Sequence, residues 1–240
     1  MLISSDLQKT LFGLNTSHLT VFEDIFKTEI QLHKESQGAF LKLQKAAYSE
    51  GFELHIASGF RSFERQLTIW NDKFNGQRPV LDDANNAINL DGVNDLEKAI
   101  KIMRFTALPG FSRHHWGTDF DYFDAKALRL HGDGYKLKLT PDEYLNDGVF
   151  SDLYLWLQNN ANKFGYHFPY DRERNGVSPE PWHLSYTPLS SKLMNHLQSI
   201  SSVELTSILN TTEVLGRTAV LNDFEMLSQR FIFNVNQEHQ

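Results

Sequence analysis

The stretch SRHHWGTDFDYFD, residues 112–124, concentrates side chains that can bind a metal ion. The chain contains no cysteine, so disulfides are excluded and any metal site must be built from His, Asp or Glu. A catalytic zinc usually takes three protein ligands and leaves its fourth position to water. The question is whether this stretch is a zinc site or ordinary polar structure; its candidate ligands are His114, His115, Asp119, Asp121 and Asp124.

A second stretch, EPWH at residues 180–183, could supply a ligand from elsewhere in the chain. Pro179 and Pro181 flank Glu180 and oppose a helix before His183. We therefore expect the glutamate in a rigid, extended approach, close to the metal but not bound to it. A general base beside a metal-bound water needs that arrangement. The zincin pattern and the glycine-flanked nucleophilic serine are absent.

The spacing within the first stretch also needs a turn. His114 and Asp121 are seven residues apart, and on a flat strand an odd separation places side chains on opposite faces. Gly117 lets the backbone turn between them, with the histidine at a loop end and the aspartate on a strand. From spacing alone, a metal site and a hydrogen-bonded surface pair stay equally open.

The rest of the chain predicts interleaved helices and short strands. The apolar spacing indicates a helix across residues 28–51, closed by Gly51, and then a strand at 53–58. Ser62 can cap a helix to about residue 74, residues 75–92 form a loop, and Asn94 opens a helix to about 105. A loop with a short strand follows over 131–144, then an amphipathic helix ended by Gly165, and residues 175–186 form a Pro-rich approach to a strand.

This alternation lacks a long βαβ rhythm, which favours an α+β fold. We expect a small antiparallel sheet that carries the candidate zinc site and is flanked by helices. Residues 1–188 are predicted to form the main domain. Residues 189–240, which change in character to helical segments with RFIFNV as a late strand or helix tail, are predicted to form a C-terminal helical appendage packed on it.

Charge and hydropathy exclude several partners. The net charge is -7 with acidic and basic residues mixed, so nucleic acid and anionic membranes are not expected to bind. No run of eighteen apolar residues exists, so no membrane span is predicted. The first residues lack the features of a secretory signal, which predicts a cytoplasmic protein as written. A periplasmic or extracellular protein whose signal had been removed would look similar.

Three separated stretches resemble the zinc D-alanyl-D-alanine carboxypeptidase family, which includes vancomycin-resistance carboxypeptidases and dipeptidases. That family carries Ser-x-His-x-x-Gly-x-Ala-x-Asp and then Glu-x-Trp-His, which SRHHWGTDFD and EPWH match. SGFRSFERQ, residues 58–66, resembles its Ser-Gly-Tyr-Arg-Ser segment, and the resemblance covers about residues 32–188. Asp119 departs from the usual Ala and could compete as a ligand or raise a neighbour's pKa, and His115 offers a further competing ligand.

The resemblance implies the ligands and the base. His114, Asp121 and His183 would bind Zn²⁺. Glu180 would take a proton from the zinc-bound water and pass it to the leaving amine, while the zinc lowers the pKa of the water and polarises the scissile carbonyl.

The resemblance also implies a substrate-binding set. Arg61 would meet a substrate carboxylate or carbonyl oxygen, which suits its planar fork of donors. Gln66 and Ser112 would help to hold the peptide end. Each has a plainer alternative: a surface ion pair for the arginine, a solvated side chain for the glutamine and a turn or cap for the serine.

The implied function is a zinc metallopeptidase that cleaves near the C-terminus of peptidoglycan-type peptides, with D-Ala-D-Ala ends as the first expectation. An L,D-carboxypeptidase, a D,D-dipeptidase or a wall endopeptidase would use the same zinc set. A cytoplasmic enzyme would act on wall precursors or recycled fragments. The rival classes are a non-catalytic zinc-binding module and a metal-free scaffold.

Overall fold

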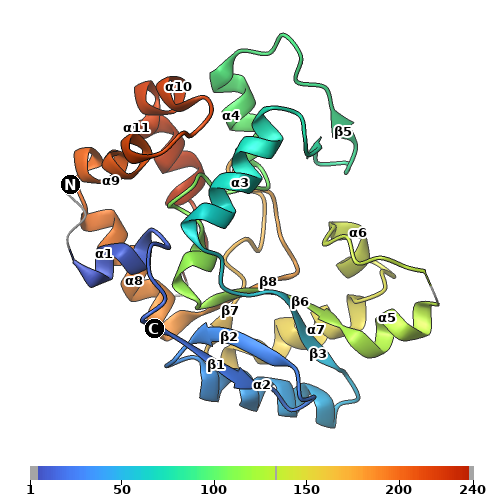
Figure 1. The fold of residues 1–240 in the computed structure, drawn as a ribbon. Helices are drawn as coiled ribbons and strands as arrows, with labels where there is room; N and C mark the ends of the chain where they lie inside the picture. The colour runs from blue at the N-terminus through green and yellow to red at the C-terminus, as the bar shows by residue number, and fades with distance from the viewer. Residues whose placement is uncertain (1–4, 133, 238–240) are drawn as a thin grey trace.

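The computed structural model describes residues 5–132 and 134–237, and it has an α+β architecture (Figure 1). The first half contains α1 (Asp6–Leu11), β1 (Leu19–Glu23), β2 (Glu29–His33), α2 (Gln37–Ser49), β3 (Leu54–Ser58), α3 (Phe63–Phe74), β4 (Val80–Leu81), β5 (Ala87–Ile88), α4 (Asp95–Met103), η1 (Arg113–Trp116) and β6 (Asp119–Asp124). The second half contains α5 (Ala125–His131), α6 (Pro141–Tyr144), α7 (Ser151–Asn160), η2 (Ala161–Phe164), β7 (Tyr166–His167), β8 (His183–Tyr186), α8 (Thr187–Ser199), α9 (Ser202–Ser207), η3 (Ile208–Thr211), α10 (Arg217–Asn222), α11 (Phe224–Leu227) and η4 (Ser228–Ile232). In this described part of the chain, no helix combines the length and apolar character that crossing a membrane requires.

The central sheet is antiparallel and has the strand order β3-β6-β8-β7. Successive side chains of a strand point to opposite faces, which divides the residues of β6 into two sets. Phe120 and Tyr122 are fully buried in the core with α2 and α7. Asp119 and Asp121 therefore face the other side, and the register places Asp121 opposite His183 of β8. The small antiparallel sheet predicted from the sequence is confirmed.

The prediction of a single helix over residues 28–51 is wrong for the first part of this range. Residues 29–33 form β2, which pairs with β1, and only residues 37–49 form α2. Ile30 and Leu32 are buried while Glu29 and Gln31 are exposed, which is the two-residue period of a strand. These apolar residues also fit a helical stripe when read together with the helix that follows, and this coincidence produced the error.

Capping residues placed the other helices correctly. The Ser62 side chain accepts from the Arg65 amide at the start of α3, and the Asn94 side chain accepts from the Glu97 amide at the start of α4. Gly165, with φ +81°, ends the helical run of α7 and η2. The short strand expected within 131–144 is wrong, because α6 is the regular element in the described part of that range. The loop at 75–92 contains the small hairpin of β4 and β5.

A second hydrophobic core joins the two ends of the chain. It contains Leu11 of α1, Trp70 of α3, Met103 of α4 and Trp116 of η1, together with apolar residues of every helix from α8 to η4. RFIFNV falls in η4 and the residues after it, so the helix-tail alternative is confirmed. Figure 1 shows the C-terminal helices beside α3 and α1. The expected boundary after residue 188 falls inside α8, and the division into two domains stays a prediction.

His167 of β7 ties the end of the chain to the sheet. Its Nδ1 lies 2.8 Å from Thr187 Oγ1 and its Nε2 lies 3.1 Å from the carbonyl oxygen of Asn236. Burial, with the nearby Arg113 charge, lowers the pKa of His167 to about 4 from 6.5. Between these values the unfolded chain binds the proton and the folded chain does not. Stability from this residue is therefore complete above pH 6.5 and is lost as the pH falls towards 4.

We expect His167→Gln to weaken the pH dependence of folding. The wild type should lose roughly 2 kcal/mol more unfolding free energy between pH 7 and pH 4 than the variant does. Urea unfolding at several pH values measures this difference. His131→Gln, at an exposed histidine of α5, is the control, and its unfolding free energy should change with pH as that of the wild type does. If the unfolding free energy of His167→Gln changed with pH as strongly as that of the wild type, this would contradict a buried, neutral imidazole at this position.

Candidate metal centre

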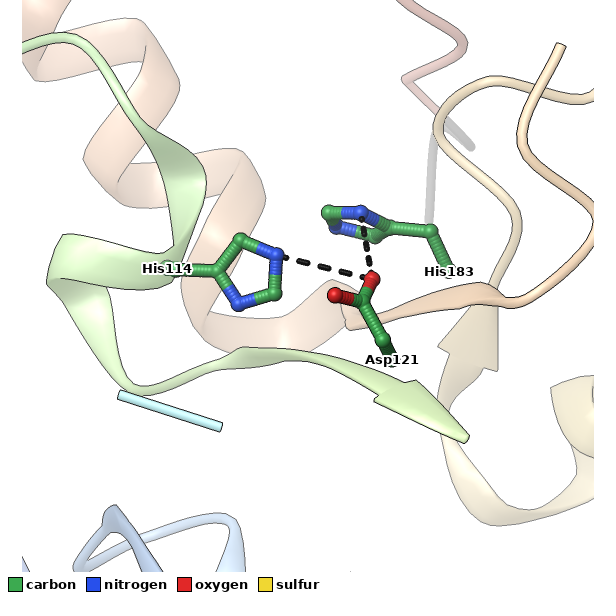
Figure 2. A group of neighbouring side chains, drawn as sticks. All are labelled: His114, Asp121 and His183. Carbon is green, nitrogen blue, oxygen red and sulfur yellow. Dashed lines mark ion pairs between the residues drawn. The ribbon is translucent and has the colours of Figure 1, made fainter. Parts of the chain in front are cut away.

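Three buried side chains from three elements meet above β6: His114 of η1, Asp121 of β6 and His183 of β8 (Figure 2). One ligand atom from each lies within 4.8 Å of the others. His114 Nε2 is 3.6 Å and His183 Nδ1 is 3.4 Å from the same oxygen, Asp121 Oδ1. The residues that the two motifs predicted as ligands are thus brought together.

Backbone conformation and register produce this meeting. Gly117 has φ +66°, a left-handed conformation that favours glycine, and it turns the chain between His114 and Asp121. A Cβ atom at Gly117 would lie 2.4 Å from Leu19 Cδ2 and 2.9 Å from the His33 amide nitrogen, so the space also requires glycine. The turn predicted at this glycine is confirmed, and the β6–β8 register supplies His183.

Hydrogen bonds fix which nitrogen each imidazole presents. His114 Nδ1 lies 2.8 Å from the Gly59 carbonyl oxygen, which can only accept, so this nitrogen donates and Nε2 faces Asp121. His183 Nε2 lies 3.0 Å from Asp119 Oδ2, which leaves Nδ1 facing Asp121. Such outer partners hold the rings of metal-binding histidines in one orientation and tautomer.

Asp119, where the family usually has alanine, lies behind His183. Its carboxylate is fully buried, accepts from Arg113 Nε at 2.7 Å and also accepts from the Thr118 and Ser185 hydroxyls. Burial alone would raise the pKa of Asp119, but the Arg113 charge and the His183 hydrogen bond bring that pKa below its usual range. The carboxylate stays ionised and orients the imidazole.

His115 also has a structural place. Its Nδ1 donates to the Arg61 carbonyl oxygen at 2.6 Å, and its Nε2 accepts from the Gly110 amide at 3.2 Å. Burial lowers the pKa of His115 to about 3. Both ring nitrogens are used within the protein, so His115 is not poised as a competing ligand.

The three side chains fit a metal ion. Asp121 Oδ1 is buried and has no hydrogen-bond partner among the described residues, which is costly for a carboxylate oxygen unless a cation satisfies it. Burial lowers the pKa of His183, but hydrogen bonds to Asp119 and Glu180 outweigh it and raise that pKa to about 9. The surroundings thus favour positive charge, and two imidazole nitrogens with one carboxylate oxygen are a donor set that zinc accepts.

Glu180 stands beside this group. Its Oε2 lies 3.1 Å from His183 Nδ1, and its side chain lines the same cavity as Asp121 and His183. The Glu180 amide donates to the Tyr170 carbonyl, and the His183 amide donates to the Glu180 carbonyl. These bonds fix the backbone of Glu180 next to His183, so that its side chain can reach the ligand atoms.

Of the predicted substrate-binding residues, Arg61 and Ser112 line the cavity, and Gln66 lies behind Arg61. Arg61 Nη1 donates to Gln66 Oε1 at 2.9 Å, and Gln66 Nε2 donates to the Ala107 carbonyl oxygen at 2.6 Å. Gln66 is fully buried, so the solvated alternative is wrong. The structure gives it the position of a residue that orients the guanidinium.

The cavity has a volume of about 410 Å³ and reaches well beyond the motifs. Sequence reasoning missed Lys73, Lys138 and Tyr170 among the residues that line it. Tyr170 packs edge-on to His183 with ring centroids 5.1 Å apart. No motif marks these three residues, and only the fold brings them to the site.

Zinc binding is expected to depend on His114. Wild-type protein purified without chelator or His tag should contain about one zinc per chain, and His114→Ala should lose it, because two ligands rarely retain zinc. Elemental analysis measures the content, and His131→Ala is the control at an exposed position. Full zinc in His114→Ala would contradict this ligand set.

Comparisons with known proteins agree with the motifs. The family described as "VanY: D-alanyl-D-alanine carboxypeptidase" matches residues 29–189, more than half of the chain. An uncharacterised protein of Haemophilus influenzae is 41% identical over 98 residues, covering 41% of this chain and 67% of the relative. The "Putative carboxypeptidase YodJ" of Bacillus subtilis is 28% identical over 167 residues, covering 67% of this chain and 49% of the relative.

Among solved structures, one described as "VanYB in complex with D-Alanine-D-Alanine" is 21% identical with a TM-score of 0.49, covering 81% of this chain and 90% of that one. The family match spans both motifs and all three candidate ligands. The chain therefore belongs to the VanY D-alanyl-D-alanine carboxypeptidase family.

Proposed function

We propose that this protein is a zinc-dependent carboxypeptidase that hydrolyses a peptide bond near the C-terminus of peptidoglycan-type peptides. One observation carries the proposal: the Glu180 carboxylate lies 3.1 Å from a candidate ligand nitrogen and faces the same cavity as the three ligand atoms. A purely structural metal site has no use for a carboxylate held in this way. Family membership supports the same class of reaction.

His114 Nε2, Asp121 Oδ1 and His183 Nδ1 would hold the zinc. A bound zinc lowers the pKa of water and polarises a carbonyl group. Glu180 takes the proton from the attacking water and delivers it to the leaving amine, which needs a carboxylate positioned beside both groups. Asp119 keeps the His183 ring in place throughout.

Arg61 would bind the substrate next to these groups. Its guanidinium lines the cavity and is oriented by hydrogen bonds to Gln66 Oε1 and, at 3.2 Å, Ser58 Oγ. Planar fork donors suit a carboxylate or a developing oxyanion. A free carboxylate close to the scissile bond, as in a peptide ending in D-Ala-D-Ala, fits this arrangement.

The test is peptide release by the zinc-loaded protein. Stem pentapeptides ending in D-Ala-D-Ala and the tetrapeptides derived from them are incubated with the protein, and released D-Ala is measured by chromatography. Release from the pentapeptide is the expected result, and release from the tetrapeptide alone would assign L,D specificity. Zinc-loaded protein that cleaves neither of them, nor a cross-linked muropeptide, would contradict the proposed function.

A further inference from the structure

The cavity at the metal centre has a basic lining, although the chain as a whole has a net charge of -7. Asp121 and Glu180 are its acidic side chains among the described residues, and Arg113 is neutralised by its buried ion pair with Asp119. Arg61, Lys73 and Lys138 line the cavity without an ion pair to any described residue, and Arg78, which is paired with Asp72, also lines it. A zinc ion would add to this positive charge, so the cavity is suited to an anionic ligand.

Lys73 is a partly buried cation of this lining that has no carboxylate partner among the described residues. It lies in the last turn of α3, half-buried, and its Nζ donates to Thr106 Oγ1 at 2.6 Å. No carboxylate in the described part of the chain lies within 4.0 Å of this ammonium group. Burial lowers the pKa of Lys73 to about 8, against the opposing charge of Glu180. A partly desolvated ammonium with a neutral partner favours an incoming anion.

Arg78 extends this charge away from the metal centre. Its Nε lies 3.0 Å from Asp72 Oδ2, and its amide donates to the Asp72 carbonyl oxygen at 2.9 Å, which holds the side chain in place. A guanidinium has five N–H donors, so further donors remain for a ligand. Lys73 and Arg78 also line a neighbouring cavity of about 350 Å³, which Lys98 lines as well. The two residues stand where the two cavities meet.

We propose that Lys73 and Arg78 form a second anion subsite, which binds a carboxylate of the substrate other than the one served by Arg61. This inference rests on the proposed function and deepens it. It implies a peptide with an additional carboxylate close to the scissile bond. A stem peptide built on a diamino dicarboxylic acid has this group, and the same peptide built on lysine does not.

Two matched peptides test the subsite by binding. Acetyl-X-D-Ala-D-Ala is prepared with X as meso-diaminopimelic acid, linked through its L centre, or as L-lysine, so the peptides differ by one carboxylate. Calorimetry on zinc-loaded Glu180→Gln protein measures both Kd values without turnover. The diaminopimelate peptide should bind about tenfold more tightly, because a charged hydrogen-bonded pair forms only with it.

Further variants of the zinc-loaded Glu180→Gln protein show which residues cause the preference for the diaminopimelate peptide. Lys73→Met should reduce the ratio of the two Kd values to within about twofold of one, and Lys73→Arg should retain most of it. Arg78→Gln should reduce the ratio independently, which keeps the test valid if Lys73→Met is poorly folded. Lys45→Met, at an exposed lysine of α2, makes the same charge change and should leave both Kd values unchanged.

Three results would overturn the subsite: equal Kd values in the parent protein, an equal loss for both peptides in Lys73→Met, or binding of neither peptide. The equal loss would mean that Lys73 holds the C-terminal carboxylate, which both peptides share. Hydrolysis by the wild type separates the two proposals. Cleavage of both peptides without preference would support the proposed function and contradict the subsite. Selective binding of the diaminopimelate peptide without cleavage of either peptide would support the subsite and contradict the proposed function.

Discussion

Glu180→Gln is expected to lower kcat for peptide release by about a thousandfold or more while zinc stays bound. Glutamine has the size of the native side chain and can still hydrogen-bond His183, but it cannot take a proton from water. The ligand atoms of His114, Asp121 and His183 belong to other side chains, so the zinc content should stay near that of the wild type.

The measurement combines kcat, elemental analysis and the melting temperature of the same samples. Glu64→Gln is the matched control, because this glutamate is exposed in the first turn of α3 and should show wild-type kcat. If zinc-loaded Glu180→Gln turned over peptide at the wild-type rate, Glu180 would not be the general base. If the biological effect of the protein survived in a variant without turnover, a non-catalytic zinc module would be the better description.

Asp119→Ala is expected to destabilise the fold by about 3–5 kcal/mol. The Arg113 guanidinium is 4% exposed, and the variant leaves it buried without its counterion, while the Ser185 and Thr118 hydroxyls lose their acceptor. The His183 ring loses its Nε2 partner as well, so zinc affinity should fall by about 10–100-fold in the protein that remains folded.

Urea unfolding of the zinc-free proteins measures the loss of stability, and zinc competition with a chelating dye measures the loss of zinc affinity. Glu53→Ala removes the partner of Arg129, whose side chain is 62% exposed, and this surface pair should contribute far less. Asp119→Asn keeps the shape without the charge and should lie between the wild type and Asp119→Ala. Full stability and zinc affinity in Asp119→Ala would contradict the supporting role of this carboxylate.

Local signals predicted the parts of the site that lie close together in sequence. The glycine turn explains how His114 and Asp121 can share a face although their separation is odd. His183 could be assigned only by resemblance, because its approach depends on the antiparallel register of β8 with β6, a long-range pairing. Capping residues likewise located α3 and α4, since a cap is a local interaction.

The sequence did not reveal the features that depend on three-dimensional packing. The sequence pattern does not tell whether Asp119 is a buried ion-pair partner of Arg113 or a competing metal ligand, because either role places a carboxylate near the histidines. Gln66 has the spacing of a solvated helix residue, yet α3 packs it against the segment at Ala107. Lys73 lies at the end of α3, and only the meeting of that helix end with Thr106 directs it into the cavity.

The joining of the two ends of the chain in one core has a consequence for synthesis on the ribosome. Met194, Leu197, Phe231 and Ile232 line the same cavity as the metal ligands. A nascent chain that has emerged as far as β8 already carries His114, Asp121 and His183, but part of the cleft wall has not yet been translated. Domains fold as units during elongation. The cleft is therefore completed only after residue 232 has emerged, well after the three ligands, and its assembly waits until η4 can pack.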